Sequence, residues 1–180
     1  MIRENEPLTP SPRDQAQARV LKVLFVCHGN ICRSTMAESM MIYMVRERGF
    51  EDEFMIDSAA TSREEIGNGP HHGTVRRLAA AGIPVVPHRA RQMTLEDYRV
   101  FDYIIGMDSE NIRGMNRITG GDPDGKFYRM LEFAGSDRDV ADPWYTGDFE
   151  ATYRDLLKGI TAFLDRYERE RSCDILKGSR

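Results

Sequence analysis

The stretch VLKVLFVCHGNICRS, residues 20–34, decides the fold. Its first seven residues are apolar with one exception and include three valines, which is typical of a strand buried on both faces of a parallel sheet. Gly29 and Asn30 then interrupt the apolar run, and methionines at helical spacing follow from Met36 until Gly49 closes the helix. We therefore expect a strand, a tight loop and a helix in direct succession.

The remaining chain continues this alternation of strands and helices. Alternating elements predict a single-domain α/β fold with a four-stranded parallel sheet in the order 2-1-3-4 and helices on both faces, Rossmann- or flavodoxin-like. Ligands of such sheets bind beyond the carboxyl ends of the strands, so we expect the site where Cys27 follows the first strand. Further strands are predicted over residues 54–59, 101–107 and 127–133, and further helices over residues 74–81, 95–100, 109–118 and 148–168.

The composition of the 180 residues, with 41% hydrophobic and 30% charged, is typical of a globular protein. A formal net charge of −4 implies no large positive field, so a nucleic-acid partner is not expected. No apolar run approaches the length of a membrane span, and the polar first twenty residues are not a secretory signal. Three cysteines do not make a secreted disulfide framework, so we expect a cytoplasmic location. Residues 1–20 are predicted to be a flexible leader, 21–168 the domain and 169–180 a polar tail.

The loop from Cys27 to Ser34 has the residue types of an anion-binding cradle. A tight loop that enters a helix points several backbone N–H groups inward, and Gly29 and Asn30 tolerate the positive φ that such a loop needs. Arg33 adds a planar guanidinium that can bind two phosphate oxygens. The helix dipole, the amides and Arg33 favour a thiolate at Cys27, and the Ser34 hydroxyl can donate a hydrogen bond to it. This arrangement predicts that Cys27 attacks the phosphorus of a bound phosphate monoester.

Simpler interpretations of the same residues stay open at this point. A cysteine after a buried strand is usually a small apolar core residue, and a Cys-x5-Arg spacing alone is weakly specific. The succession of strand, Cys, Gly-Asn, Arg-Ser and helix favours function over packing. His71 and His72 lack the spacing to further ligands that a metal site needs, so we expect neither a metal nor another cofactor.

Residues 23–34 closely resemble the active-site loop of the low-molecular-weight protein-tyrosine phosphatases. The resemblance implies hydrolysis of phosphotyrosine in proteins, and of small aryl phosphates, through a cysteinyl-phosphate intermediate. The expected partners are therefore phosphotyrosine-containing proteins, and we expect a monomer or weak self-association. The resemblance continues through residues 57–62, 66–68, 88–92, 101–105, 107–108 and 142–145, and covers about residues 22–167.

The resemblance also implies catalytic roles. Cys27 would be the nucleophile, Arg33 would bind the phosphoryl oxygens, and Asp142 would be the general acid and then the base that activates water. Independently, Pro143 pushes Asp142 out of helical geometry and into a loop, although a simple Asp-Pro turn would do the same. The phosphate-binding loop would comprise His28, Gly29, Asn30, Ile31, Cys32, Arg33 and Ser34.

Residues around the loop would support these roles. Ser58 and His88 would hold Asn30 in its loop conformation, and Ser34 would support the thiolate. Cys32 would be the redox partner that traps the oxidised nucleophile as a reversible disulfide. The roles of Ser58, His88 and Cys32 are implied by the resemblance alone.

The walls of the pocket depart in part from the family pattern. Trp144 and Tyr145 resemble an aromatic wall that stacks on a substrate ring, although Trp144 could equally anchor its loop. Glu64 stands where many members have an aromatic residue, so this wall is predicted to be acidic and to favour basic residues beside the phosphotyrosine.

Three other activities remain as alternatives. Arsenate reductases of this fold use further cysteines, and none lies between Cys32 and Cys173. Protein-arginine phosphatases of the family have Thr where this chain has Ile31, whose apolar side chain fits a phosphotyrosine better. A phosphate or phosphopeptide binder without catalysis, with Cys27 and Cys32 as a redox switch, is the second hypothesis.

Overall fold

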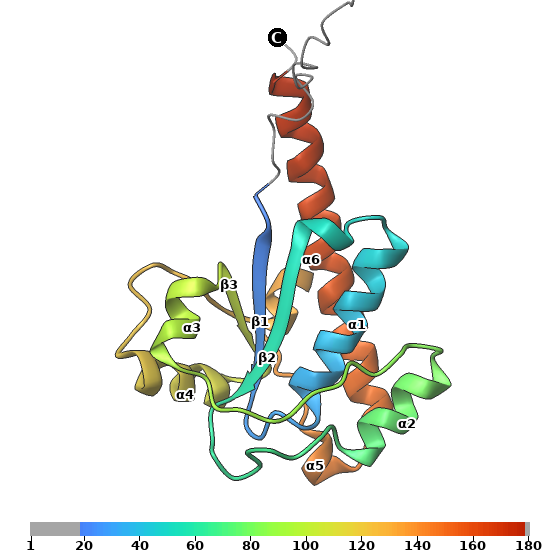
Figure 1. Cartoon of the computed structure of the whole chain (residues 1–180), viewed down its shortest axis with the longest axis vertical. Coiled ribbons are helices and arrows are strands. Elements are labelled where there is room, and N and C mark those ends of the chain that lie inside the picture. Colours follow the sequence, from blue (N-terminus) through green and yellow to red (C-terminus); the bar gives the residue numbers. More distant parts are fainter. Residues whose placement is uncertain (1–18, 179–180) are drawn as a thin grey trace, which may run out of the picture.

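Four short strands form one parallel sheet at the centre of the molecule (Figure 1). The structure, a computed structural model, describes residues 19–178, so nearly all of the predicted leader lies outside the described residues. The strands pair in the order β2-β1-β3-β4, and each neighbouring pair is parallel. This arrangement confirms the predicted α/β fold and its strand order. The strands are β1 (Leu21–Cys27), β2 (Phe54–Ala60), β3 (Tyr103–Gly106) and β4 (Phe127–Arg129).

Helices cover both faces of the sheet, as predicted. Figure 1 shows α1, α2 and α6 on one side of the strands and α3 and α4 on the other. Two short 3-10 helices, η1 (Glu51–Glu53) and η2 (Met130–Ala134), complete the described elements. The α-helices are α1 (Arg33–Glu47), α2 (His72–Ala80), α3 (Leu95–Val100), α4 (Ser109–Thr119), α5 (Pro143–Thr146) and α6 (Phe149–Gly178).

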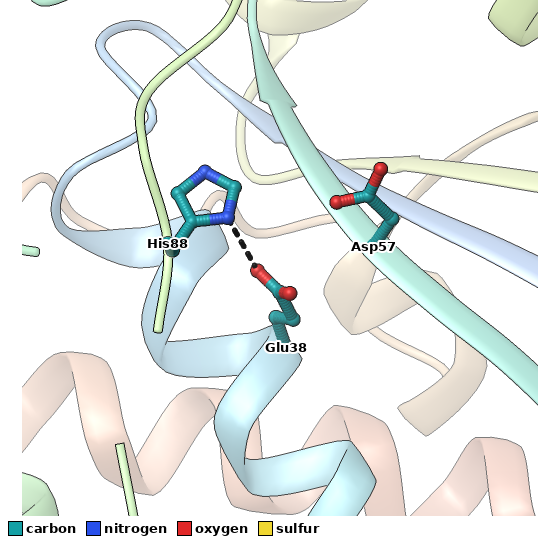
Figure 2. A group of neighbouring side chains, drawn as sticks. All are labelled: Glu38, Asp57 and His88. Carbon is teal, nitrogen blue, oxygen red and sulfur yellow. Dashed lines mark ion pairs between the residues drawn. The ribbon is translucent and has the colours of Figure 1, made fainter. Parts of the chain in front are cut away.

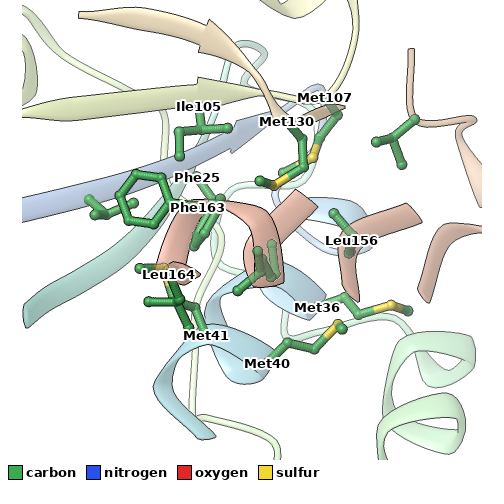
Figure 3. Close-up of a cluster of buried hydrophobic side chains, with 14 of the residues drawn as sticks. Phe25, Met36, Met40, Met41, Ile105, Met107, Met130, Leu156, Phe163 and Leu164 are labelled. Carbon is green, nitrogen blue, oxygen red and sulfur yellow. The ribbon is translucent and has the colours of Figure 1, made fainter. Parts of the chain in front are cut away.

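Alternating residues of β1 divide between two apolar cores because successive side chains of a strand point to opposite faces. Val23 and Phe25 belong to the larger core, which Figure 3 shows packed between the sheet and helices α1 and α6. Leu24 and Val26 belong to the second core, under α3 and α4. All four side chains are fully buried, which fixes the position of the loop that follows β1.

Helix ends follow local sequence signals. Thr94 caps α3 and forms a reciprocal capping box with Asp97. Asp108 caps α4 by accepting a hydrogen bond from the backbone N–H of Asn111 at 2.7 Å. Gly120 ends the same helix with φ 79°, a left-handed conformation that glycine adopts without strain.

The fourth strand is shorter than predicted. Only Phe127–Arg129 pairs with β3, because β3 itself ends at Gly106, opposite Arg129. Beyond this point the chain turns into η2, where Met130 and Leu131 are buried in the larger core. The strand predicted over residues 127–133 is therefore wrong in its second half.

The last helix is longer than predicted. It begins at Phe149, close to the expected start, but continues to Gly178 instead of ending near residue 168. Contacts with the body support this extension, since Arg171 pairs with Glu53 at 2.7 Å and lies over the Phe50 ring. Within residues 19–178, no helix combines the length and apolarity needed to cross a membrane.

Candidate active site

The loop that joins β1 to α1 forms the floor of the site. Cys27 is the last residue of β1, one residue beyond the predicted end of the strand, and Arg33 is the first residue of α1, within the predicted start. Asn30 adopts φ 59°, in the left-handed region. Gly29 has no positive φ, so that part of the prediction was wrong. The glycine instead makes room for Glu65, because a Cβ added at Gly29 would lie 3.2 Å from Glu65 Cγ.

The sulfur of Cys27 has polar partners in the loop and in the first turn of α1. The backbone N–H of Asn30 donates to Sγ at 3.3 Å, and the Ser34 hydroxyl lies 3.1 Å from it. Cys27 also lines a surface pocket together with His28 and Asp142, although it is only 3% exposed. The sulfur is therefore presented to the pocket and is not merely part of the apolar core.

Two carboxylates hold the guanidinium of Arg33, which is 2% exposed. Nη1 donates to Asp108 Oδ2 at 2.5 Å and to the Val140 carbonyl at 3.1 Å, and Nη2 donates to Asp142 Oδ2 at 2.8 Å. Burial alone would lower the pKa of Arg33, but the negative charges of Cys27, Asp142 and Asp108 raise it above its ordinary value. Arg33 therefore stays charged, while its buried Nε has no hydrogen-bond partner among the described residues.

Asp108 is one of the site residues that sequence reasoning missed. Its two oxygens serve different partners: Oδ2 accepts from Arg33, and Oδ1 caps α4. The signal was available in principle, because Asp108 follows the third predicted strand at the same sheet edge where Cys27 follows the first. A polar residue there is placed towards the site by the parallel topology itself.

Asp142 lies opposite the loop, at the start of a one-turn helix. Its backbone is extended, with φ −81° and ψ 114°, which confirms the predicted effect of Pro143. The helix α5 was not predicted; Pro143 begins it because its fixed φ suits a first helical position. Oδ1 of Asp142 accepts a hydrogen bond from the Trp144 backbone N–H at 3.1 Å. The other oxygen, Oδ2, accepts the hydrogen bond from Arg33.

The side-chain amide of Asn30 is fully buried and fully bonded. Its Nδ2 donates to Ser34 Oγ and Ser58 Oγ, both at 2.9 Å. Its Oδ1 accepts from His88 Nε2 at 2.7 Å and from the Arg91 backbone N–H at 3.1 Å. The structure thus brings Ser58 and His88 onto Asn30 as expected, and these bonds fix the left-handed turn of the loop.

Cys32 is the second buried thiol of the loop, and it lines the same pocket. Burial, followed by the charge of Cys27, raises the pKa of Cys32 to about 12. Cys32 is therefore a protonated thiol at neutral pH.

The pocket has an aromatic wall and an acidic wall. Trp144 and Tyr145 are 57% and 82% exposed, so Trp144 is not a buried anchor of its loop. Glu64 and Glu65 line the other side, and Glu64 Oε2 lies 2.9 Å from His28 Nε2. The acidic character that the sequence predicted for this wall is therefore present at the pocket mouth.

Known proteins resemble this chain over most of its length. The model of a family described as low molecular weight phosphotyrosine protein phosphatase matches residues 22–173. The chain is 39% identical to the low molecular weight protein-tyrosine-phosphatase YfkJ of Bacillus subtilis, over 84% of this chain and 99% of YfkJ. It is 38% identical to the human low molecular weight phosphotyrosine protein phosphatase, over 84% of this chain and 98% of the human protein.

Solved structures resemble the chain over a similar length. The crystal structure of YfkJ matches with a TM-score of 0.82 and 38% identity, over 86% of this chain and 98% of that one. The crystal structure of a Drosophila arginine phosphatase matches with a TM-score of 0.73 and 31% identity, over 82% of this chain and 98% of that one.

Proposed function

The chain belongs to the low molecular weight phosphotyrosine protein phosphatase family and is a phosphatase, and from this premise we propose that it hydrolyses phosphotyrosine in proteins through a cysteinyl-phosphate intermediate. The observation that carries the proposal is the position of Cys27 Sγ, which accepts the Asn30 N–H at the base of the pocket that also contains Asp142. The proposed roles are Cys27 as nucleophile, Arg33 as phosphate ligand and Asp142 as acid and base.

Substrate binding would use donors that the loop already orients. A phosphate dianion in the loop would accept hydrogen bonds from backbone N–H groups, and the positive N-terminal end of the α1 dipole would stabilise its negative charge. The unpartnered Nε of Arg33 supports this role, because a buried N–H without an acceptor is costly and an oxyanion would satisfy it. Asp108 would keep the guanidinium in place while the phosphate binds.

In the first chemical step, the Cys27 thiolate attacks phosphorus, an S–P bond forms, and the bond from phosphorus to the aryl oxygen breaks. Asp142 gives its proton to the leaving phenolate. The phosphate dianion competes with Asp142 for the charge of Arg33, and its own negative charge favours the protonated carboxyl. This competition explains how an aspartate paired with an arginine in the free enzyme can act as an acid.

In the second step, the Asp142 carboxylate takes a proton from water, and the resulting nucleophile attacks phosphorus. The S–P bond breaks, inorganic phosphate leaves, and the Cys27 thiolate is restored. The loop N–H groups and Arg33 stabilise the charge on the equatorial oxygens in both transition states.

Hydrolysis of p-nitrophenyl phosphate in the presence of EDTA tests the proposal. We expect full activity with the chelator, and we expect Cys27→Ser to abolish turnover while phosphate still binds. A protein that binds phosphate but never hydrolyses the ester would support the non-catalytic binder instead.

The substrate class needs a direct comparison, because one structural relative is an arginine phosphatase. Ile31 lines the pocket with an apolar side chain, which favours an aryl ester. Phosphotyrosine, phosphoarginine and arsenate should be tested side by side, and we expect phosphotyrosine to be preferred. Preference for either of the others would overturn the assignment.

A cytoplasmic location stays a prediction.

A further inference from the structure

Two groups of titratable side chains adjoin the phosphate-binding loop. Figure 2 shows the first group, in which Glu38 on α1, Asp57 on β2 and His88 on the segment after α2 lie close together. Its His88 bonds to the loop itself, so this group is part of the candidate site. The second group, His71 and His72 at the start of α2, lies beside the aromatic wall of the pocket and takes no part in the proposed reaction.

Three contacts fix the position of His71. Its backbone N–H donates to the carbonyl of Ile31, a residue of the loop, at 2.7 Å. Its Nδ1 accepts a hydrogen bond from the Gly73 backbone N–H at 3.0 Å and so caps α2. Its ring stacks on the Phe149 ring, with 5.2 Å between the ring centres and an angle of 6° between the rings. His71 is therefore held by the loop, by its own helix and by the start of α6.

The contact through Nδ1 requires a neutral imidazole, because a protonated Nδ1 has no lone pair with which to accept. Burial, followed by the charges of His72 and Arg76, lowers the pKa of His71. The charge of Glu65 acts in the opposite direction but is the smallest of these effects. The ring of His71 is therefore neutral at neutral pH, with its hydrogen on Nε2 and its Nδ1 free to cap the helix.

Trp144 is the wall residue that His71 contacts, and Figure 1 shows its helix, α5, next to the start of α2. The two rings meet edge to face, with 5.8 Å between their centres and an angle of 75°, which is a geometry that aromatic pairs favour. Trp144 is mostly exposed and lies on a helix of one turn. An exposed side chain changes its rotamer within nanoseconds unless a neighbour restrains it. His71 supplies such a neighbour.

We propose that His71 is a positioning residue of the aromatic wall: its ring holds Trp144 where the indole stacks on the aryl ring of the substrate. Because His71 also bonds to Ile31, one residue sets the distance between this wall and the floor of the pocket. His71 itself does not line the pocket, so it acts through Trp144. The inference rests on the proposed function and adds to it a structural source of preference for aryl over alkyl phosphates.

Two substitutions separate the ring of His71 from its role as a helix cap. His71→Asn removes the ring but keeps a cap, since the asparagine side chain also accepts a hydrogen bond from the first turn. His71→Phe keeps a ring between Phe149 and Trp144 but leaves the Gly73 N–H without its acceptor. If His71 were only a cap, His71→Phe would be the harmful change in every measurement.

The binding of phenylphosphonate and of methylphosphonate, measured by calorimetry, tests the proposal. Neither compound is hydrolysed, and only phenylphosphonate carries a ring that can stack on Trp144. We expect the ratio of the two affinities to fall about two- to tenfold in His71→Asn, which is what a single aromatic contact contributes, and to stay closer to wild type in His71→Phe. Urea unfolding should give the opposite order, with His71→Phe the less stable variant. An unchanged ratio in His71→Asn, or a larger loss in His71→Phe, would overturn the proposal.

The fluorescence of Trp144 separates this inference from the proposed function, because it needs neither ligand nor turnover. Trp144 is the only tryptophan of the 180 residues, so the tryptophan emission of the protein comes from this wall alone. We expect a lower anisotropy in His71→Asn, since a released indole turns within nanoseconds, and a value near wild type in His71→Phe.

His72→Asn is the matched control for the fluorescence, because the same change is made one residue away, at a ring 4.1 Å from that of His71. Its anisotropy should stay near wild type. An anisotropy of His71→Asn equal to that of wild type, or an equal fall in His72→Asn, would overturn the proposal. Failure of wild type to bind either phosphonate would instead contradict the proposed function, and the anisotropy would still decide whether His71 restrains Trp144.

Discussion

At the residue scale, one guanidinium links two carboxylates with different tasks. Asp108 and Asp142 both bond to Arg33, but only Asp142 lines the pocket with Cys27. Asp108 is engaged twice, by Arg33 and by the first turn of α4, so it is held firmly. Asp142 lies beside a proline and an exposed aromatic pair. Under the proposed function, an incoming phosphate would draw Arg33 away from it.

Asp142→Asn tests the acid without removing the cap of α5, because asparagine also caps helices. General acid catalysis contributes about 10²–10⁴-fold, and a poor leaving group depends on it most. We expect kcat/KM for phenyl phosphate to fall about a hundredfold or more, and that for p-nitrophenyl phosphate to fall much less. Equal losses with both esters would show that Asp142 is not the acid.

Asp108→Asn tests the positioning of Arg33 in the same way, since the cap of α4 is again preserved. Loss of a hydrogen bond between charged groups costs about 1.5–3 kcal/mol, so we expect kcat/KM to fall about ten- to hundredfold. Asp124→Asn, an exposed control, should stay near wild type. Unchanged kinetics of Asp108→Asn would mean that Arg33 needs no second carboxylate.

At the scale of elements, close approaches between backbones decide where strands and helices end. Gly159 on α6 packs against η2, and a Cβ added there would lie 2.7 Å from the Met130 carbonyl. This contact places Met130 in the larger core and helps to explain why the chain leaves β4 so early. The long helix α6 thereby determines the shape of a segment that the strand pattern alone could not predict.

The substitution Gly159→Ala tests how closely α6 packs against η2. Alanine normally stabilises a helix interior by about 1 kcal/mol relative to glycine. If Gly159 had no close tertiary contact, the substitution would therefore increase the free energy of unfolding. Overpacking against a backbone carbonyl costs about 1–3 kcal/mol, and we expect a net fall in the free energy of urea unfolding. Lys158→Ala, on the exposed side of the same turn, should change stability by about 0.5 kcal/mol or less. A more stable Gly159→Ala would contradict the packing argument.

At the scale of the whole molecule, the buried acid beside the candidate active site lowers the stability of the folded protein as pH rises. Burial raises the pKa of Glu38 from 4.5 to about 7, so the folded protein keeps a proton there that the unfolded chain releases. The sign follows from linkage: folded stability declines as pH rises from about 4.5 to about 7. The buried hydrogen bonds from Asn30 through Ser58 to Glu38 are thus maintained at a cost in stability that grows between these two pH values.

Urea unfolding at pH 5 and pH 8 (~3 pH units apart, spanning most of the shift) measures this cost. Relative to Glu38→Gln, the wild type should lose stability on the order of a few kcal/mol over this interval. Glu51→Gln should follow the wild type at both pH values. If wild type and Glu38→Gln changed in parallel, Glu38 would not keep its extra proton in the folded state.

The sequence predicted features that depend on neighbouring residues better than features that depend on contacts between distant parts of the chain. The strand, loop and helix around Cys27 follow from local patterns, and the structure confirms them together with the strand order. Asp108 was missed because its bond to Arg33 joins residues 75 positions apart, which no local pattern encodes. Glu38 was missed because a polar residue on an apolar helix is normally exposed, and only the assembled fold gives it partners.

The central claim is a covalent bond between Cys27 and phosphorus, and the most direct measurement is to trap it. Asp142→Asn should accumulate the intermediate with p-nitrophenyl phosphate, because a good leaving group departs without an acid while hydrolysis lacks its base. After a denaturing quench, fragmentation mass spectrometry should locate one phosphoryl group on Cys27. Continued turnover with no phosphoryl group on that sulfur, or turnover by Cys27→Ser, would contradict the account.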